Sequence, residues 1–227
     1  MMDNTIAVLE QVLLKAISKD AVEEWIERYA IPFKELMAYY KCAIMRVETK
    51  FKVLNENFSL MSDSNPIENI ESRLKSPKSI VDKMIRYNIP FTVDSIEKNL
   101  HDVAGVRVTC SYLSNIYELE EAFLNQDDVT LIQRKDYIEN PKPNGYRSLH
   151  LIISVPIFLQ KEKKEMMVEL QLRTLAMDTW ASFEHKIRYK KQNGRITDGV
   201  SAELLECANL CTELDKKMEH IESIAHL

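Results

Sequence analysis

Apolar residues between positions 33 and 58 recur at alternating steps of four and three. They are Phe33, Met37, Tyr40, Ile44, Val47, Phe51, Leu54 and Phe58. This spacing predicts a long helix with one apolar face, preceded by Pro32, a residue that the first turn of a helix tolerates. The face either packs on the chain's own domain or forms a seam between copies of the chain, and the pattern fits both. A shorter amphipathic helix is predicted before it, over residues 5–17.

After residue 62 the apolar residues gather in short runs rich in β-branched side chains, which predict strands. These runs are Val103–Cys110, Val129–Lys135, Ser148–Val155 and Met166–Arg173. Helical spacing predicts helices over Val93–Leu100, Ile116–Leu124 and Thr174–Lys190, the last with Leu175, Trp180 and Phe183 on its apolar side. A terminal amphipathic helix repeats the four-three rhythm at Cys207, Cys211, Leu214, Met218, Ile221 and Ala225.

The last predicted strand alternates between apolar and polar side chains. One face carries Val168, Leu170 and Leu172, and the other carries Glu169, Gln171 and Arg173. We therefore expect one side of the sheet to pack under helices and the other to present a carboxylate, an amide and a guanidinium. An antiparallel sheet with an ordinary solvated face has the same pattern, so the alternation alone does not identify a site.

The composition limits the kinds of nucleotide site that the chain can build. Of 227 residues 45% are hydrophobic, which supports a packed core, but only 4 are glycine. No GxGxxG or GxxxxGK[ST] motif occurs, so any phosphate binding must come from Lys and Arg side chains. The net charge of −5 makes non-specific binding to nucleic acid unfavourable, and we expect no nucleic-acid partner.

The cysteines and the chain start bear on the compartment. The 4 cysteines form no CxxC pair, and the start has no signal-peptide pattern. No apolar run approaches the length of a membrane span. We expect a cytoplasmic protein with free thiols and no membrane partner.

A turn-rich loop between residues 140 and 150 carries the first group of candidate binding residues. Two prolines fix the backbone, and the Asn144-Gly145 pair tolerates positive φ. Along the loop lie Lys142, Tyr146, Arg147 and His150. Cations and a flat ring on a fixed loop suit a purine nucleotide with several phosphates, and a basic surface turn is the alternative.

A second cationic segment lies earlier in the chain. Its polar residues are Arg73, Lys75, Ser79 and Lys83, with Ser76-Pro77 predicted to open a helix whose buried face is Ile80, Met84 and Ile85. A helix N-terminus attracts anions, and Ser79 and Lys83 lie one turn apart, where both can point toward a phosphate. A solvated cationic face is the alternative.

Taken together, the motifs from about residue 65 to 191 closely resemble the synthetase domain of the RelA/SpoT family, and most closely its small alarmone synthetases of the RelP and RelQ type, nearer to RelP. The motifs are Arg73-x-Lys75-x-x-x-Ser79-x-x-x-Lys83, Asp102-x-Ala-Gly-x-Arg107, Asp136-Tyr-x-x-x-Pro-Lys142-x-x-Gly-Tyr146-Arg-Ser-x-His150, Glu169-x-Gln171-x-Arg173-Thr and Trp180-Ala-x-x-Glu184-His185. The resemblance implies a synthetase without a hydrolase domain. It also implies transfer of pyrophosphate from ATP to the 3′-hydroxyl of GTP or GDP, which gives pppGpp or ppGpp and AMP.

The resemblance also implies a role for each matching residue. ATP would be held by Arg73 and Arg107 around the adenine and by Lys75, Ser79 and Lys83 on the phosphates. Mg²⁺ would be bound by Asp102 and Glu169, with Glu169 also a candidate base for the acceptor hydroxyl. The acceptor would be held by Tyr146 on the guanine, by Lys135, Lys142, Arg147 and His150 on the 5′-phosphates, and by Gln171 and Asp178 beside the nucleoside.

The fold that we expect is α/β, with a mixed, mostly antiparallel five-stranded sheet of the nucleotidyltransferase-like synthetase type and helices packed around it. Residues 1–62 would form a helical oligomerisation region, 63–192 the synthetase core and 193–227 a C-terminal interface helix. The resemblance implies a homotetramer built by the two terminal regions.

Several readings stay open on the residues alone. A nucleotidyltransferase that moves a nucleoside monophosphate would need a carboxylate pair beside a Gly-Ser turn, which the chain lacks. A silent nucleotide or RNA sensor would lose a metal carboxylate, whereas Asp102 and Glu169 are both present. Asp102 and Arg107 differ in strand parity, so Asp102 should precede the strand or follow a kink at Gly105. The preference between GTP and GDP is open, partly because Asp178 stands where relatives carry Asn.

Overall fold

The structure is a computed structural model that describes residues 26–61, 65–160, 162–190 and 197–225. Its elements are η1 (Ile26–Ala30), α3 (Ile31–Met61), β1 (Ile67–Leu74), α4 (Pro77–Arg86), α5 (Val93–Asn99), β2 (Ala104–Cys110), α6 (Leu113–Leu124), β3 (Thr130–Asp136), β4 (Leu149–Phe158), β5 (Lys163–Thr174), α7 (Leu175–Lys190) and α8 (Asp198–Ala225). The helix predicted over residues 5–17 lies outside the described residues.

The strands form one five-stranded sheet in the order β1-β2-β5-β4-β3. Only β2 and β5 pair in parallel, and the other three pairs are antiparallel. The expected mixed, mostly antiparallel α/β sheet is therefore confirmed, as are the four strands predicted from apolar runs. The fifth strand, β1, had not been assigned from the sequence, because this edge strand buries little beyond Ile67 and shows no clear alternation.

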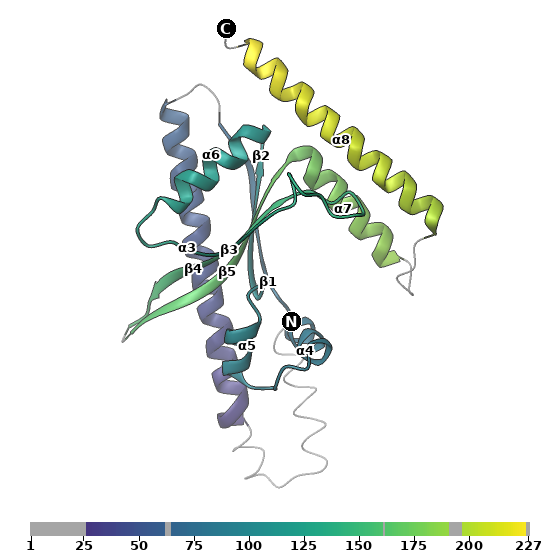
Figure 1. Cartoon of the computed structure of the whole chain (residues 1–227). Helices are drawn as coiled ribbons and strands as arrows, with labels where there is room; N and C mark the ends of the chain where they lie inside the picture. The colour runs from purple at the N-terminus through teal and green to yellow at the C-terminus, as the bar shows by residue number, and fades with distance from the viewer. Residues whose placement is uncertain (1–25, 62–64, 161, 191–196, 226–227) are drawn as a thin grey trace.

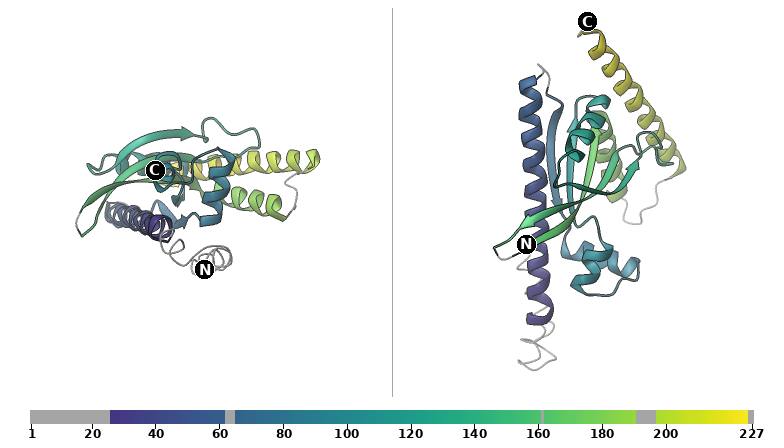
Figure 2. Two further views of the ribbon diagram at one scale, coloured as in Figure 1. Left: turned by 90° about the horizontal axis from the view of Figure 1, so that it is seen from below. Right: turned by 60° about the vertical axis from the view of Figure 1, so that its left-hand side comes forward.

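The long helix α3 covers one face of the sheet together with α6 (Figure 1; Figure 2). Its apolar face packs into the core of its own chain, where Tyr40, Val47 and Phe51 are at most 1% exposed. The rings of Phe51 and Phe123 of α6 stack with centroids 4.5 Å apart. Of the two alternatives for this apolar face, the structure has the intramolecular one.

For two helices, the prediction of the apolar face includes residues that the structure leaves exposed. In α4 Ile80 and Met84 are buried as expected, but Ile85 is 63% exposed. In α7 Trp180 is buried, whereas Leu175 and Phe183 are more than half exposed. Each error arises because the packed stripe is narrower than the full run of apolar residues. No helix in the described part of the chain is long and apolar enough to span a membrane.

Helix α8 runs beside α7 at the edge of the molecule away from α3 (Figure 1). The two helices share a second, smaller core around Trp180, Ala181, Leu204 and Ala208. The opposite side of α8 is apolar but exposed, and it carries Leu210, Leu214, Met218, Ile221 and Ile224. The terminal helix is thus confirmed, with one face on its own chain and one apolar face toward solvent.

Candidate active site

The face of the sheet opposite α3 carries a row of polar side chains that crosses all five strands. The row runs, strand by strand, through Glu71, Arg107, Gln171, His150 and Lys135, each opposite the next in register. Residues paired in this way point to the same face of a sheet. Strand pairing therefore brings together residues that lie up to a hundred positions apart in the sequence.

A second row lies two residues along each strand and holds Arg73, Gly105 and Glu169. Because Gly105 has no side chain, the sheet surface has a depression between Arg73 and Glu169. A cleft of about 500 Å³ opens there, lined by Glu71, Ser72, Arg73, Gly105, Val106, Arg107, Glu169 and Gln171. This volume lies within the range of small-molecule sites.

Five side chains above this cleft form a closed ring of polar contacts. Gln171 donates to Glu169 at 2.9 Å, and Arg173 donates to Gln171 at 2.8 Å. Arg173 also donates to the hydroxyl of Tyr146, which in turn lies 2.7 Å from Nε2 of His150. Nδ1 of His150 faces Glu169 at 3.6 Å and completes the ring. Each side chain is thereby held in one orientation before any substrate arrives.

Arg173 is the centre of this arrangement, and sequence analysis gave it no role of its own. Its side chain is only 5% exposed, and its Nη1 also pairs with Asp178 at 3.1 Å. A buried guanidinium is costly unless it is paired, so these contacts are required for the fold as well as for the site. The signal was available, because Arg173 continues the alternation of Glu169 and Gln171.

Asp102 lies in the turn just before β2, as the parity argument required. Lys75 pairs with its Oδ2 at 2.9 Å and Lys83 with its Oδ1 at 2.7 Å. Burial acts to raise the pKa of Asp102, but the hydrogen bonds from Lys83 and Lys75 outweigh it and hold the pKa below its ordinary value. At neutral pH the group is a carboxylate held between two ammonium groups.

Lys75 reaches Asp102 from the position just after β1, and Lys83 reaches it from α4. Ser76 caps α4 by accepting from the backbone N–H of Ser79, and the hydroxyls of Ser76 and Ser79 lie 2.9 Å apart. With no acidic residue in its first turn, the N-terminus of α4 is an electropositive end beside Lys75 and Lys83. This end of the cleft is suited to phosphate groups.

Glu169 is also ionised. Burial acts to raise its pKa, while the neighbouring His150 and the hydrogen bond from Gln171 lower it, and the net effect is a pKa below the ordinary value. The charge of Asp102 acts to raise the same pKa, so the two carboxylates lie near enough to interact. Carboxylate oxygens suit Mg²⁺, which in nucleotide sites takes one or two of them and completes its shell with phosphates and water. The residues present fit that ion.

The loop between β3 and β4 carries the aromatic part of the site. The ammonium of Lys142 lies 4.5 Å from the ring centre of Tyr137 and 4.6 Å from that of Tyr146. Asp136 fixes the start of the loop, since its Oδ1 accepts from the backbone N–H groups of Ile138 and Glu139. Tyr137 and Asp136 belong to the motif quoted above, but neither had been given a role.

Arg107 and Asp178 join the two ends of the cleft. Nη1 of Arg107 lies 3.2 Å from Asp178 and 3.3 Å from Glu71. The charge of Arg107, on a strand with otherwise largely buried side chains, is thereby paired. Asp178 forms an ion pair with Arg107 and accepts a hydrogen bond from Arg173, so it lies between the two predicted nucleotide subsites.

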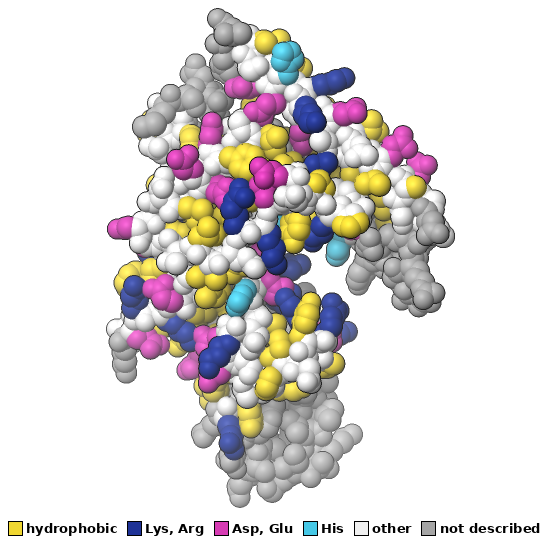
Figure 3. Space-filling model, viewed as in Figure 1, with side chains coloured by type: hydrophobic (Ala, Val, Ile, Leu, Met, Phe, Trp, Pro, Cys, Tyr) yellow, Lys and Arg dark blue, Asp and Glu magenta, His cyan; other side chains and the backbone are white. Residues whose placement is uncertain are grey.

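Three predicted residues lie outside these contacts. Lys135 is exposed on edge strand β3, opposite His150. Arg73 is exposed at the rim of the cleft. Arg147 is directed into the loop itself, where it donates to the backbone carbonyl of Ile138 at 2.9 Å. In the space-filling view Lys and Arg side chains gather along the concave side of the molecule, between α4 and α7 (Figure 3).

Comparison with known proteins now identifies the family. A family model described as a region found in RelA/SpoT proteins matches residues 72–194. The chain belongs to the RelA/SpoT family. It is 40% identical over 200 residues to the GTP pyrophosphokinase YwaC of Bacillus subtilis strain 168, which covers 88% of this chain and 91% of that protein.

Solved structures of the family have the same fold. Small alarmone synthetase 2 from Bacillus subtilis aligns with a TM-score of 0.77 and 40% identity, over 84% of this chain and 98% of that chain. Small alarmone synthetase 1 bound to its product pppGpp aligns with a TM-score of 0.77 and 32% identity, over 84% and 96%. The same synthetase bound to AMPCPP aligns with a TM-score of 0.73 and 29% identity, over 86% and 97%. Within the family, this chain is therefore similar to the small synthetases along nearly their whole length.

Proposed function

We propose that this protein is a GTP pyrophosphokinase that transfers pyrophosphate from ATP to the 3′-hydroxyl of GTP or GDP. The products are AMP and pppGpp or ppGpp. The observation that carries the proposal is a pair of ionised carboxylates that lie near enough to interact, one of which lines the polar cleft on the open face of the sheet. One of them, Asp102, is paired with lysines from the phosphate-binding end, and the other, Glu169, belongs to the aromatic and amide ring. The relatives' names and the pppGpp and AMPCPP complexes support the same reaction.

In this proposal the donor nucleotide occupies the end of the cleft near α4. The guanidinium planes of Arg73 and Arg107 stack on the adenine, and Lys75, Ser79 and Lys83 bind the phosphates. Lys75 and Lys83 now neutralise Asp102. Mg²⁺ would be held by Asp102 and Glu169, and when bound it would supply charge neutralisation for the transferred group. Lys75 and Lys83 would then be available to phosphate oxygens.

The acceptor occupies the other end. Tyr146 stacks on the guanine, with its ring plane fixed because its hydroxyl is held by Arg173 and His150. Gln171 and Asp178 contact the nucleoside, and Lys135, Lys142 and His150 bind the 5′-phosphates. Arg147 supports the loop from inside in the present structure.

The chemical step is largely one of positioning. The 3′-oxygen of the acceptor attacks the β-phosphorus of ATP, the bond from that phosphorus to the α-bridging oxygen breaks, and AMP leaves with the bond electrons. The proton of the 3′-hydroxyl passes to Glu169. Because phosphoryl transfer needs little covalent participation from the protein, orientation and cationic groups supply most of the rate enhancement.

The reaction is tested by incubating the purified protein with ATP, Mg²⁺ and either GTP or GDP, and separating the nucleotides by anion exchange. We expect AMP and a guanosine 3′-pyrophosphate in equal amounts. Release of inorganic pyrophosphate would instead indicate a nucleotidyltransferase, and no turnover would indicate a silent binding protein. Either result would refute the proposal.

A matched pair of variants tests the site. Glu169→Gln should reduce alarmone formation by roughly a hundredfold or more, because it removes a charged group from the reacting centre. Glu165→Gln changes an exposed carboxylate four residues earlier on β5, paired with Lys163, and should leave the rate unchanged. Equal losses in both variants would argue against a specific role for Glu169.

We further propose a homotetramer in the cytoplasm. The apolar face of α8 supports the first part, because a contiguous exposed apolar stripe on a helix marks an interaction surface. The 4 cysteines, none of them in a disulfide among the described residues, are compatible with a reducing compartment.

A further inference from the structure

The acceptor loop lies directly against α8. Gly145 is buried with φ +89°, a conformation that suits glycine, and its backbone contacts the helix. A Cβ at Gly145 would lie 2.5 Å from Cβ of Ala208 and 3.2 Å from Cδ1 of Leu205. Since Ala208 is 3% exposed, neither side of this contact has room for a larger side chain.

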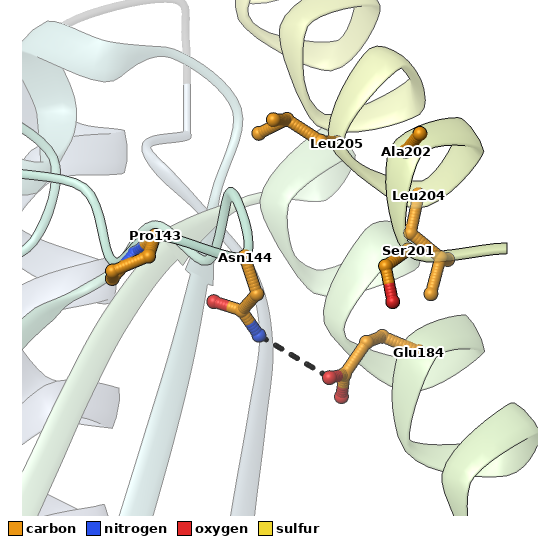
Figure 4. Close-up of a pocket in the computed structure, with 7 residues that line it drawn as sticks. All are labelled: Pro143, Asn144, Glu184, Ser201, Ala202, Leu204 and Leu205. Atoms are coloured by element: carbon orange, nitrogen blue, oxygen red, sulfur yellow. Dashed lines mark hydrogen bonds between the residues drawn. The ribbon is translucent and has the colours of Figure 1, made fainter. Parts of the chain in front are cut away.

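The loop is less tightly packed on either side of this contact. Pro143 and Asn144 stand across a pocket of about 380 Å³ from Leu205 and Ser201 (Figure 4). A hydrogen bond of 3.2 Å from Asn144 to Glu184 of α7 spans its edge. The Gly145–Ala208 contact is therefore a close point of support for a loop that is otherwise only partly packed.

A second connection joins α8 to the strand that carries the polar ring. Asp215, only 8% exposed, accepts a hydrogen bond of 2.9 Å from Thr174, the residue next to Arg173. Burial raises the pKa of Asp215, whereas the charge of Arg147 in the loop acts to lower it. Arg147, Gly145 and Asp215 line one small cavity. The loop and the end of β5 therefore contact neighbouring turns of α8.

A third connection passes through Trp180. Its indole N–H donates to the carbonyl of Leu204 in α8 at 2.7 Å. Its ring meets the ring of Tyr146 edge-on, with centroids 6.4 Å apart. At its other end α8 is anchored by Glu219, which accepts from the backbone N–H groups of Leu113 and Ser114 at the start of α6. Helix α8 is thus fixed at both ends, and between these two points it packs against the acceptor loop.

We propose that α8 positions the acceptor loop, and that Ala208 and Asp215 are positioning residues for the guanine nucleotide although neither lines the cleft. The proposal rests on the proposed function, because it assigns the acceptor to this loop. The ATP end of the cleft is built by β1, β2 and α4, with which α8 shares none of these contacts. Displacing the loop from α8 therefore weakens binding of the acceptor and leaves binding of ATP unchanged.

The test is Ala208→Val, which inserts two carbon atoms against Gly145. Overpacking of this size displaces a neighbour, and we expect the KM for GTP or GDP to rise roughly fivefold or more, which corresponds to about 1 kcal/mol or more. The affinity for a fluorescent ATP analogue should stay within about twofold of wild type, because the substitution changes the free energy of binding at the acceptor subsite and not at the ATP subsite. Asp215→Asn keeps an acceptor for Thr174 but removes the charge facing Arg147, and should change the KM in the same direction.

Two control variants distinguish a specific effect on the position of the acceptor loop from a general loss of stability. Ala225→Val inserts the same two carbon atoms at an exposed position of α8 and should retain the wild-type KM. Glu213→Gln changes an exposed carboxylate on the same helix and should also be neutral. Hydrogen–deuterium exchange of residues 138–148, measured without nucleotide, should be faster in Ala208→Val and Asp215→Asn only.

The exchange experiment distinguishes failure of the proposed enzymatic function from failure of the proposed role of α8. If wild-type protein makes no alarmone, the proposed function fails, while faster exchange in Ala208→Val still shows that α8 supports the loop. If wild type is active and Ala208→Val retains both slow exchange and the wild-type acceptor KM, α8 does not position the loop. Parallel loss of ATP and acceptor binding would also overturn the proposal.

Discussion

At the scale of single residues, Arg173 shows how one buried side chain can organise a site. Nη1 of its guanidinium donates to Asp178, and Nη2 donates to both Gln171 and Tyr146. A lysine has a single ammonium and cannot maintain this forked geometry. Arg173→Lys should therefore lower kcat/KM for the acceptor by roughly ten- to a hundredfold, the effect of losing one charge-assisted hydrogen bond.

The measurement is steady-state kinetics with the acceptor varied, alongside thermal unfolding. Arg46→Lys is the matched control, because Arg46 of α3 also pairs with a carboxylate, that of Asp128, but on the face of the sheet away from the cleft. It should lower stability without changing the kinetics of folded enzyme. An acceptor kcat/KM for Arg173→Lys equal to that of wild type would show that the ring does not orient the acceptor.

Asp102 predicts a dependence of stability on pH. Its pKa in the folded protein is held below the ordinary value of 3.8 by Lys83 and Lys75, against the opposing effect of burial. An acid with a lowered folded pKa stabilises the fold above its unfolded pKa, and that contribution is lost as the pH falls through the folded pKa. Asp102→Asn should thus be less stable than wild type at pH 7, and the gap should shrink below pH 3.8.

Urea unfolding of both proteins at a series of pH values, without nucleotide or metal, gives this difference directly. Asp82→Asn, on the exposed side of α4, is the control for loss of a carboxylate charge. Its stability should differ little from wild type throughout. A gap for Asp102→Asn that stays constant from pH 7 to pH 3 would contradict the lysine pairing.

At the scale of elements, α3 is part of the core, and this changes the expected effect of substitution on it. Ile44 is 6% exposed on the face against the sheet, and Met45, the next residue, is 57% exposed. Ile44→Asp would bury an unpaired charge and should destabilise the fold by roughly 3 kcal/mol or more. Met45→Asp should change the melting temperature little.

Circular dichroism melting of the two variants decides the point. A large loss for Ile44→Asp alone supports the packing described above. If Ile44→Asp instead folded with an unchanged melting temperature and only dissociated the oligomer, α3 would be an intermolecular seam after all.

The elements also show what periodicity can and cannot predict. The strands β2, β4 and β5 were predictable because each is a run of apolar or alternating residues long enough to be distinctive. Edge strand β1 was not, because its pairing depends on hydrogen bonds to β2 rather than on buried side chains. The apolar spacing of α3 predicted a helix but not its partner, since an intramolecular sheet and a second helix select the same stripe.

The site was predictable in its residues and not in its contacts. Motif spacing indicated Asp102, Lys75 and Glu169, but only the pairing of β1, β2 and β5 brings the three close together. The contact between Gly145 and Ala208 could not have been foreseen, because it joins positions 63 residues apart through a small residue that has no periodic signal. Arg147 stays a predicted phosphate ligand, and its hydrogen bond to the backbone of the loop could not be foreseen because it follows from tertiary packing alone.

At the scale of the whole molecule, α8 has two faces with different partners. The inner face holds the acceptor loop, and the outer face exposes Leu210, Leu214 and Ile221, each more than half exposed. Stable interfaces bury such stripes, and a charge placed at the centre of one is left desolvated and unpaired in the assembly. Leu214→Asp should therefore break the proposed tetramer while leaving the monomer folded, because Leu214 makes no contribution to either core cluster.

Light scattering coupled to size-exclusion chromatography measures the mass, and Lys216→Ala on the same helix is the control. We expect four chain masses for wild type and the control, and a smaller species for Leu214→Asp. Because the same helix supports the acceptor loop, dissociation should also raise the acceptor KM more than the ATP KM. A Leu214→Asp protein that remained tetrameric would place the interface elsewhere, and one that dissociated with unchanged kinetics would show that the two faces of α8 act independently.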